Sequence, residues 1–182
     1  MSSDKKKPSH FIPPLNFSPV ISTDVSLYRS GYPMPINYPF IRDQLNLKTV
    51  IYIGDKKDTP AEYLDFLKDE KIKFYHIPME SCRDIGIKES MNDMLKLVLN
   101  FENYPILMHS NKGKHRVGVA VGIIRKFLQG WSTAGVYQEY GIFSGGLKDE
   151  ADLEFITMFE SQLEVNKSKV PGFAQINFEK KV

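Results

Sequence analysis

The segment 105–118 gathers residue types that bind phosphate. It begins with the apolar run Pro-Ile-Leu-Met and ends in Val-Gly, and between them stand His109, Ser110, Asn111, Lys112, Gly113, Lys114, His115 and Arg116. The pattern predicts a buried strand, a short polar loop with one glycine, and an apolar helix. Successive backbone N–H groups at such a turn form a concave anion site, which the helix dipole reinforces. Lys112, Lys114 and Arg116 add positive charge, and an arginine can bind two phosphate oxygens at once. We therefore expect 109–116 to bind phosphate.

Two other interpretations of this segment are weaker. A Walker-type nucleotide loop has a glycine separated by four residues from its Gly-Lys pair, and that position holds Met108. A solvated basic turn is the common explanation of a charge run. The buried strand and helix predicted on either side disfavour it here.

The segment resembles the His-Cys-x5-Arg-Ser/Thr signature of the cysteine-dependent phosphatases. More narrowly, 109–118 (HSNKGKHRVG) is similar to the His-Cys-x-Arg/Lys-Gly-Lys-His-Arg-Thr-Gly form of the plant and fungal atypical dual-specificity phosphatases. Within that family the chain most resembles the fungal tyrosine-phosphatase-like proteins linked to oxidant-induced cell-cycle arrest. The resemblance covers about 11–159 and includes 27–31 with Pro33, 105–107, Arg125-Lys126, Trp131-Ser132 and Glu139-Tyr140.

The resemblance implies a fold, a mechanism and ligands. The fold is α/β, with a central, mainly parallel sheet flanked by helices. In the family a cysteine thiolate attacks phosphorus, the arginine and the loop amides hold the transferring group, and an acid protonates the leaving oxygen. Members act on phosphotyrosine model substrates and, in the plant and fungal branch, on inositol pyrophosphates. The resemblance also suggests a hetero-complex with sibling phosphatase-like proteins.

Two positions depart from the family pattern. Ser110 stands at the nucleophile position, and a hydroxyl stays protonated in a site whose field ionises a thiol. His109 or His115 could supply the base that a serine nucleophile needs, although the first of these is structural in the related signature. Val117 replaces the Ser/Thr that assists departure of the thiolate, and it has no hydroxyl. Loss at both positions indicates a natural sequence that no longer uses the chemistry.

The general acid is expected in the loop 79–86, which follows a predicted strand. Glu80, Asp84 and Glu89 lie in or beside this loop, and spacing to Ser110 favours Asp84. Cys82 in the same loop is interpreted as an ordinary half-buried thiol, with redox sensing as the alternative.

These observations support three hypotheses. The first is a catalytically degenerate phosphatase that binds phosphate or an inositol polyphosphate and regulates or scaffolds related phosphatases. The second is slow hydrolysis of inositol pyrophosphates or phosphoesters. The third is a scaffold with a vestigial loop, in which Phe143 and the segment 141–147 contact a partner.

Composition limits the remaining function classes. The chain has 182 residues, a net charge of +2 and 42% hydrophobic residues, which fits one globular domain and no nucleic-acid partner. One cysteine excludes an internal disulfide and a four-thiolate zinc site, and we expect no metal or cofactor. No apolar run reaches the ~18–20 residues of a membrane span, and the N-terminus does not fit a secretion signal, so we expect a cytoplasmic protein without membrane partners. We expect a disordered tail over 1–10, a phosphatase-like domain over 11–165 and a C-terminal extension over 166–182.

The predicted elements would position the loop at the edge of a sheet. Strands are expected at 18–22, 26–30, 48–54, 73–78 and 104–109. Helices are expected at 37–47 with Asn37 as a possible N-cap, at 59–70 with Thr59 as N-cap, and at 88–100, 116–129, 132–140 and 149–163. This alternation predicts βαβ units, whose ligands bind beyond the carboxyl ends of the strands. The loops after Ile53, Pro78 and Met108 lie there.

Overall fold

One five-stranded sheet forms the centre of the computed structural model, which describes residues 10–55, 59–146 and 149–175. The strands are β1 (Ser18–Ser22), β2 (Ser26–Ser30), β3 (Thr49–Gly54), β4 (Lys73–Pro78) and β5 (Ile106–His109). Their order is β1-β2-β5-β3-β4, with β1 antiparallel to β2 and the other neighbours parallel. The expected α/β fold with a mainly parallel sheet is confirmed.

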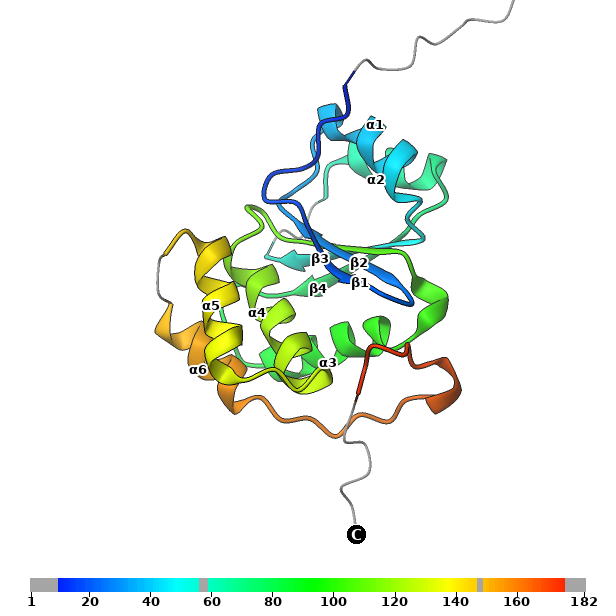
Figure 1. Cartoon of the computed structure of the whole chain (residues 1–182). Helices are drawn as coiled ribbons and strands as arrows, with labels where there is room; N and C mark the ends of the chain where they lie inside the picture. The colour runs from blue at the N-terminus through cyan, green and yellow to red at the C-terminus, as the bar shows by residue number, and fades with distance from the viewer. Residues whose placement is uncertain (1–9, 56–58, 147–148, 176–182) are drawn as a thin grey trace, which may run out of the picture.

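Helices cover both faces of this sheet (Figure 1). The α-helices are α1 (Tyr38–Phe40), α2 (Ala61–Asp69), α3 (Ile87–Val98), α4 (His115–Ile123), α5 (Thr133–Ser144) and α6 (Glu150–Met158). Shorter 3-10 turns are η1 (Pro35–Asn37), η3 (Phe101–Asn103) and η5 (Lys167–Lys169), and π-helical turns are η2 (Ile41–Leu45) and η4 (Ile124–Leu128). In Figure 1, α1 and α2 lie on one face of the sheet and α3 to α6 on the other.

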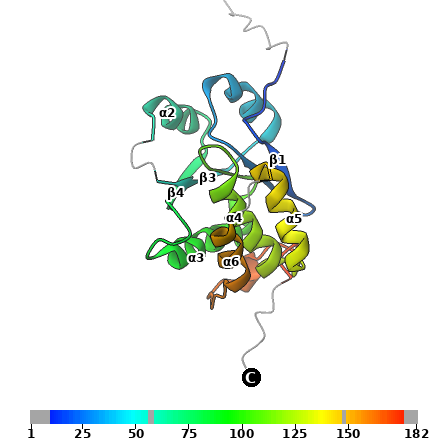
Figure 2. The ribbon, with the colours of Figure 1, turned by 90° about the vertical axis from the view of Figure 1, so that its left-hand side faces the viewer.

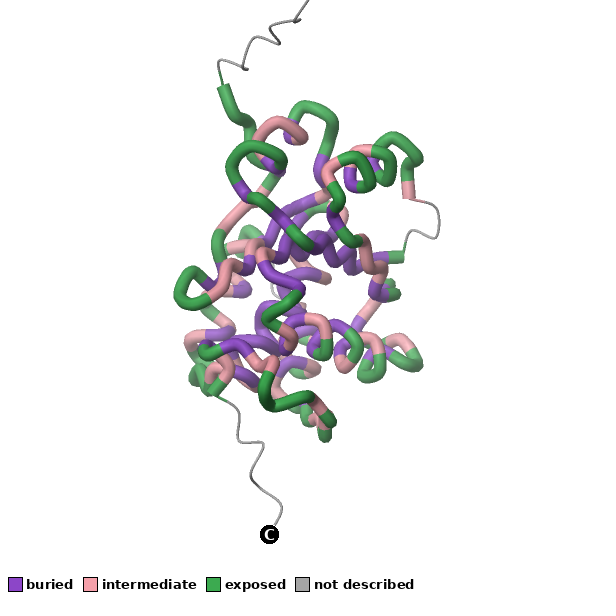
Figure 3. Tube along the Cα trace, turned by 90° about the vertical axis from the view of Figure 1, so that its right-hand side faces the viewer, coloured by how far each residue is buried: buried purple, intermediate pink, exposed green. Residues whose placement is uncertain are grey.

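β3 shows why a continuous apolar run makes the middle of such a sheet. All six of its residues are buried. Ile51 and Ile53 belong to the core beneath α3 to α6, whereas Val50 belongs to the smaller core beneath α2 and η2. Alternate side chains therefore enter two different cores, as expected of a strand covered on both faces. Figure 3 shows the resulting concentration of buried residues in the middle of the molecule.

α4 is the central helix of the larger helical layer. Its residues from Val117 to Ile123 are all buried, and the turn η4 continues it to Leu128, close to the end of the predicted helix. α4 lies among α3, α5 and α6 in Figure 2. At Gly122 an added Cβ would come within 2.6 Å of the Ile156 side chain, so glycine permits close contact between α4 and α6.

Several predicted helix limits differ from the structure. The expected helix 37–47 is divided among η1, α1 and η2, and the Asn37 amide bonds Met34 N–H and the carbonyls of Ile12 and Pro13 instead of capping the helix. α2 begins after Pro60, so Thr59 is not its N-cap. α6 ends at Met158, before 163, because the backbone becomes extended at Phe159.

The chain beyond α6 packs back onto the domain. Phe173 is 8% exposed and belongs to the larger core, with its ring 6.4 Å from that of Tyr104. The segment expected as an extension therefore contributes a side chain to the core. Of the expected tail over 1–10, all but His10 lies outside the described residues, as do 176–182 of the extension. No helix in the described ranges is long and apolar enough to cross a bilayer.

Candidate phosphate-binding site

The loop 110–114 lies beyond the carboxyl end of β5 and leads into α4. It forms one wall of a cavity of about 340 Å³. Residues from the loop after β4 and from the start of α6 complete the wall. The lining residues are Met79, Glu80, Ser81, Ser110, Asn111, Lys112, Lys114, His115, Arg116, Asp149 and Asp152.

Close packing against the end of β2 fixes the shape of this loop. Gly113 has φ +73°, and a Cβ there would lie 2.5 Å from the nitrogen of Gly31 and 2.7 Å from the carbonyl carbon of Ser30. The Ser110 N–H donates to the Ser30 carbonyl at 3.3 Å. Only glycine fits position 113, because both the backbone angle and the available space exclude a side chain.

Arg29 of β2 holds the loop from inside the protein. Its Nη2 donates to the carbonyls of Gly113 at 3.2 Å and Lys114 at 3.4 Å, and its guanidinium lies 3.7 Å from the centre of the Phe143 ring. The side chain is 1% exposed, and burial lowers the pKa of Arg29 to about 10. Phe143, considered above as a partner contact, packs against this arginine.

His109 supports the loop from behind. It is fully buried, its Nε2 lies 3.0 Å from the Tyr63 hydroxyl, and its ring stacks on Tyr52 with centroids 5.1 Å apart. The Tyr52 hydroxyl donates to Asn111 Oδ1 at 2.9 Å, which fixes that loop side chain. The sequence did not predict that these two tyrosines support the loop. Tyr52 lies in an apolar strand and Tyr63 on the apolar face of a helix, and these positions indicated only burial.

Ser110 lines the cavity and has 3% of its surface exposed. Its Oγ accepts the Gly113 N–H at 3.1 Å. The two nearby histidines contact tyrosines: His109 Nε2 bonds the Tyr63 hydroxyl, and His115 Nδ1 lies 2.8 Å from the Tyr140 hydroxyl. These contacts do not form the Ser–His pair that was considered from sequence.

Val117 is fully buried on the first turns of α4 and belongs to the larger core. Its apolar side chain packs where the family pattern has a hydroxyl. The side chain at position 117 therefore contributes packing and supplies no hydrogen-bond donor to the loop.

The three predicted cations all line the cavity but are held differently. Arg116 Nη1 pairs with Asp55 Oδ1 at 3.0 Å, and its Nε donates to the Glu80 carbonyl at 3.2 Å. Within the described ranges, Lys112 and Lys114 have no ion pair. The two ammonium groups are therefore available to an anion, whereas Arg116 is shared with an internal carboxylate.

The three predicted acids differ in their surroundings. Asp84 lines a neighbouring cavity, and its Oδ2 accepts the N–H groups of Glu80 and Ser81, both at 2.8 Å. Its carboxylate thus stabilises the loop's turn. Glu89 is exposed in the first turn of α3. Glu80 is the one of these three acids that lines the loop cavity.

Two other carboxylates reach the cavity from α6. Asp149 caps this helix by accepting the Asp152 N–H, and Asp152 is 5% exposed. The residue pattern indicated Asp149 only as a helix start, and it did not predict a role for Asp152. The residues around Asp149 and Asp152 carry no pattern that predicts a binding site. The two carboxylates reach the loop because α6 packs on α4.

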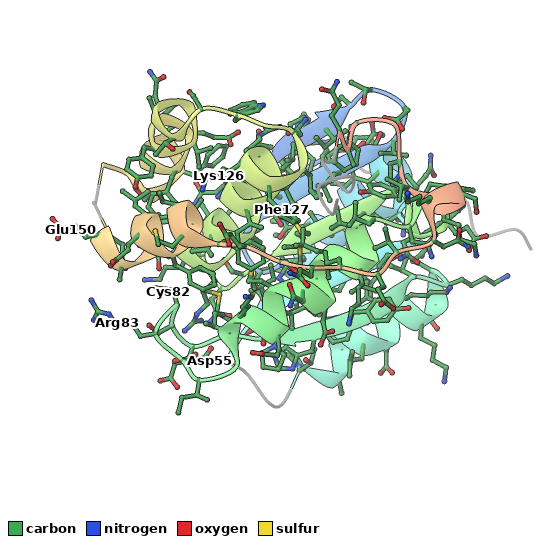
Figure 4. All side chains as sticks on the ribbon, turned by 90° about the horizontal axis from the view of Figure 1, so that it is seen from below. Asp55, Cys82, Arg83, Lys126, Phe127 and Glu150 are labelled. Atoms are coloured by element: carbon green, nitrogen blue, oxygen red, sulfur yellow. The ribbon has the colours of Figure 1, made fainter. Side chains whose placement is uncertain are left out.

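Asp152 belongs to a hydrogen-bonded chain of side chains. Its Oδ2 accepts the Tyr140 hydroxyl at 2.5 Å, and that hydroxyl contacts His115. Burial raises the pKa of Asp152, while hydrogen bonds from Tyr140 and Cys82 act in the opposite direction. Burial, followed by the bond to Asp152, raises the pKa of Cys82 to about 12. Figure 4 shows Cys82 inside this region and the neighbouring Arg83 pointing outward.

His115, Asp149 and Asp152 each place one potential ligand atom within 4.8 Å of the others. Tyr140 already bonds both His115 and Asp152. The hydrogen-bonded chain accounts for this proximity, and we do not assign a metal site to it.

Comparisons with known proteins agree with this geometry. The model of the tyrosine phosphatase family matches residues 11–177. The tyrosine-protein phosphatase-like protein OCA2 of Saccharomyces cerevisiae is 70% identical over 165 residues, covering 91% of this chain and 84% of OCA2. Inositol diphosphatase DSP3 of Arabidopsis thaliana is 37% identical, covering 88% and 77%. The core catalytic domain of the S. cerevisiae PP-IP phosphatase SIW14, solved with citrate, matches with TM-score 0.73 and 38% identity over 83% of this chain and 89% of that structure.

Proposed function

The chain belongs to the tyrosine phosphatase family, and within it we propose that this protein is a catalytically degenerate member. It binds phosphate or an inositol polyphosphate in the loop cavity and regulates or scaffolds related phosphatases. The observation that carries the proposal is Ser110, whose Oγ accepts the Gly113 N–H at the bottom of an otherwise retained phosphate loop. Its location is proposed to be cytoplasmic, which imaging of a fluorescently tagged chain would test.

The retained features all serve binding. Backbone N–H groups converge at the start of α4, and Lys112 and Lys114 line the cavity. Each charge-assisted contact to a phosphate oxygen is favourable because the loop is already ordered by Arg29 and Gly113. Binding therefore does not require the loop to rearrange.

The missing features all serve turnover. A serine hydroxyl needs a base within hydrogen-bond distance, whereas Ser110 Oγ accepts the Gly113 N–H, and His109 Nε2 and His115 Nδ1 bond tyrosine hydroxyls. The Val117 side chain cannot donate a hydrogen bond to a leaving group. A chain that binds its ligand without hydrolysing it can act by associating with other proteins, and the family resemblance suggests sibling phosphatase-like chains as those partners.

Calorimetric titration with inorganic phosphate, inositol hexakisphosphate and an inositol pyrophosphate, with phosphate release followed in parallel, tests this proposal. We expect binding without release, and loss of most affinity in Arg116→Ala. The matched control is Arg83→Ala, which makes the same charge change at an exposed arginine in the loop after β4. Rapid release by the wild-type chain would contradict degeneracy, and absence of binding would favour the scaffold with a vestigial loop.

The second candidate function is slow hydrolysis of inositol pyrophosphates or phosphoesters. Relatives named inositol diphosphatase favour it, as does the good leaving group of a pyrophosphate. This function predicts phosphate release that disappears in Arg116→Ala and whose rate changes in Ser110→Ala. Release that ignores both substitutions comes from a contaminating enzyme.

A further inference from the structure

Three side chains from three helices form a line that begins at the loop cavity. His115 is the first residue of α4, Tyr140 lies on α5 and Asp152 on α6. His115 Nδ1 lies 2.8 Å from the Tyr140 hydroxyl, which lies 2.5 Å from Asp152 Oδ2. His115 and Asp152 both line the cavity.

The number of available protons fixes the direction of both hydrogen bonds. A carboxylate only accepts, so the single proton of the Tyr140 hydroxyl is donated to Asp152. Burial and the bond to Asp152 raise the pKa of Tyr140, which keeps that proton in place. The hydroxyl oxygen can then only accept from His115. The proton of the neutral imidazole therefore resides on Nδ1, and a lone pair resides on Nε2.

We infer that Tyr140 and Asp152 are positioning residues that hold His115 in its Nδ1-protonated form, so that Nε2 takes up a proton when an oxyanion enters the cavity. The inference rests on the proposed function, because the oxyanion is the ligand proposed above. The His115 side chain is 40% exposed, and its Nε2 has no hydrogen-bond partner among the residues that the structure describes. An unprotonated Nε2 would place its lone pair against the ligand's oxygens. A proton from solvent forms the N–H bond that converts this repulsion into a charge-assisted contact.

The charges around His115 make this uptake depend on the ligand. The groups that share its cavity or its hydrogen-bonded chain are Lys112, Lys114 and Arg116 of the loop and α4, Glu80 and Cys82 after β4, Tyr140 of α5, and Asp149 and Asp152 of α6. The three cations oppose a positive imidazole and the three carboxylates favour it, whereas the thiol and the phenol are neutral. A bound dianion adds negative charge on the side of Nε2 and favours the imidazolium.

Proton uptake can be measured directly with inorganic sulfate, which stays a dianion across the pH range in which imidazoles titrate. Calorimetry at pH 7.5 in buffers of different ionisation enthalpy gives the number of protons bound with each sulfate. We expect net proton uptake in the wild type, and none in His115→Gln. In Tyr140→Phe the released ring can present Nε2–H without taking up a proton, so uptake falls to less than half of the wild-type value.

Tyr137→Phe is the matched control. It removes a hydroxyl from the same helix, one that bonds Thr157 and Leu153 of α6 but not His115. Its proton uptake should equal that of the wild type. Equal uptake in Tyr140→Phe and Tyr137→Phe would overturn the inference.

Nitrogen NMR of the free protein gives a readout that needs no ligand. The ¹⁵N signals of neutral His115 should show the Nδ1–H tautomer in the wild type and in Tyr137→Phe, and a shift toward Nε2–H in Tyr140→Phe. A predominant Nε2–H tautomer in the wild type would overturn the inference. Failure of sulfate to bind any of the chains would count against the proposed function, while the nitrogen signals would still decide the tautomer.

Discussion

Arg116 Nη1 lies 3.0 Å from Asp55 Oδ1, so the arginine that the loop would offer to a phosphate is already paired within the protein. Its Nε also donates to the Glu80 carbonyl at 3.2 Å. A guanidinium binds a phosphate best through two parallel N–H donors, and both of these contacts occupy donors of that kind. Asp55 follows the end of β3 and lines the neighbouring cavity. The ion pair therefore joins a residue of the loop cavity to a residue of the neighbouring one, and Asp55 competes with any anion in the first.

Asp55→Asn should increase phosphate affinity. The change removes a negative charge beside the anion site and releases one donor edge of Arg116. The pair is partly exposed, with Asp55 43% and Arg116 22% accessible, so the gain is expected to be only about twofold to fivefold. Calorimetric titration with inorganic phosphate measures it.

Asp93→Asn is the control for net charge, since Asp93 pairs with Lys96 on the surface of α3. It should leave the affinity unchanged. Weaker binding in Asp55→Asn would show that Asp55 orients Arg116 for the ligand and does not compete with it.

Restoring the two family residues one after the other should restore first the formation of a covalent intermediate and then its rapid turnover. Ser110→Cys is expected to cleave p-nitrophenyl phosphate in a burst of about one equivalent and then turn over slowly, the pattern of an accumulating covalent intermediate. Adding Val117→Thr should raise the steady rate by roughly 10²-fold, the effect of one hydrogen-bond donor at the reacting group. Stopped-flow absorbance resolves the burst from the steady phase.

The control for an added thiol is Ser90→Cys, on α3 outside the loop cavity. It should show neither burst nor turnover. If the wild type already turns over as fast as the double variant, Ser110 is a working nucleophile and the chain is an enzyme.

The anion site and the sheet could be predicted from the sequence. The strand, loop and helix around 105–118 are contiguous, so their residue types alone predicted an anion site at the start of α4. The sheet followed from apolar runs such as β3, whose side chains enter cores on both faces. Both features are encoded by residues that are close to one another in the sequence, so they can be predicted without the structure.

The opposite wall of the cavity depends on tertiary packing. Asp149 and Asp152 reach the loop because Gly122 lets α6 approach α4 closely. Nothing in the local pattern distinguishes these carboxylates from exposed acids. Asp84 was predicted as the acid from chain spacing, and the structure adds a contact that spacing does not reveal, since its carboxylate accepts two backbone N–H groups of its own loop.

Cys82 should be unreactive in the folded protein. Burial, with the nearby Asp152, raises the pKa of its thiol to about 12, so at pH 8 the thiolate is at least about a thousandfold scarcer than for an ordinary cysteine. Alkylation by iodoacetamide, followed by mass spectrometry, should be correspondingly slow in buffer and fast in urea. As the sequence contains one cysteine, each adduct reports this site alone.

Asp152→Asn should accelerate the alkylation only modestly, because burial is the larger cause of the raised pKa. Rapid alkylation of the folded wild type would instead support the redox-sensing interpretation of Cys82.

Gly113→Ala should destabilise the protein more than the same change at another glycine of similar backbone angle. Gly113 and Gly130 have φ +73° and +70°, so alanine is strained by about 1–2 kcal/mol at either position. Around Gly130 there is open space, whereas a Cβ at 113 would meet the backbone of Ser30 and Gly31. Because backbone atoms cannot move aside as a flexible side chain does, the overpacking adds about 1–3 kcal/mol at 113 alone. Urea unfolding of both variants measures the difference in free energy of unfolding. Equal losses of unfolding free energy would mean that the loop is not held against β2. The proposal that anion binding relies on a preordered loop would then be contradicted.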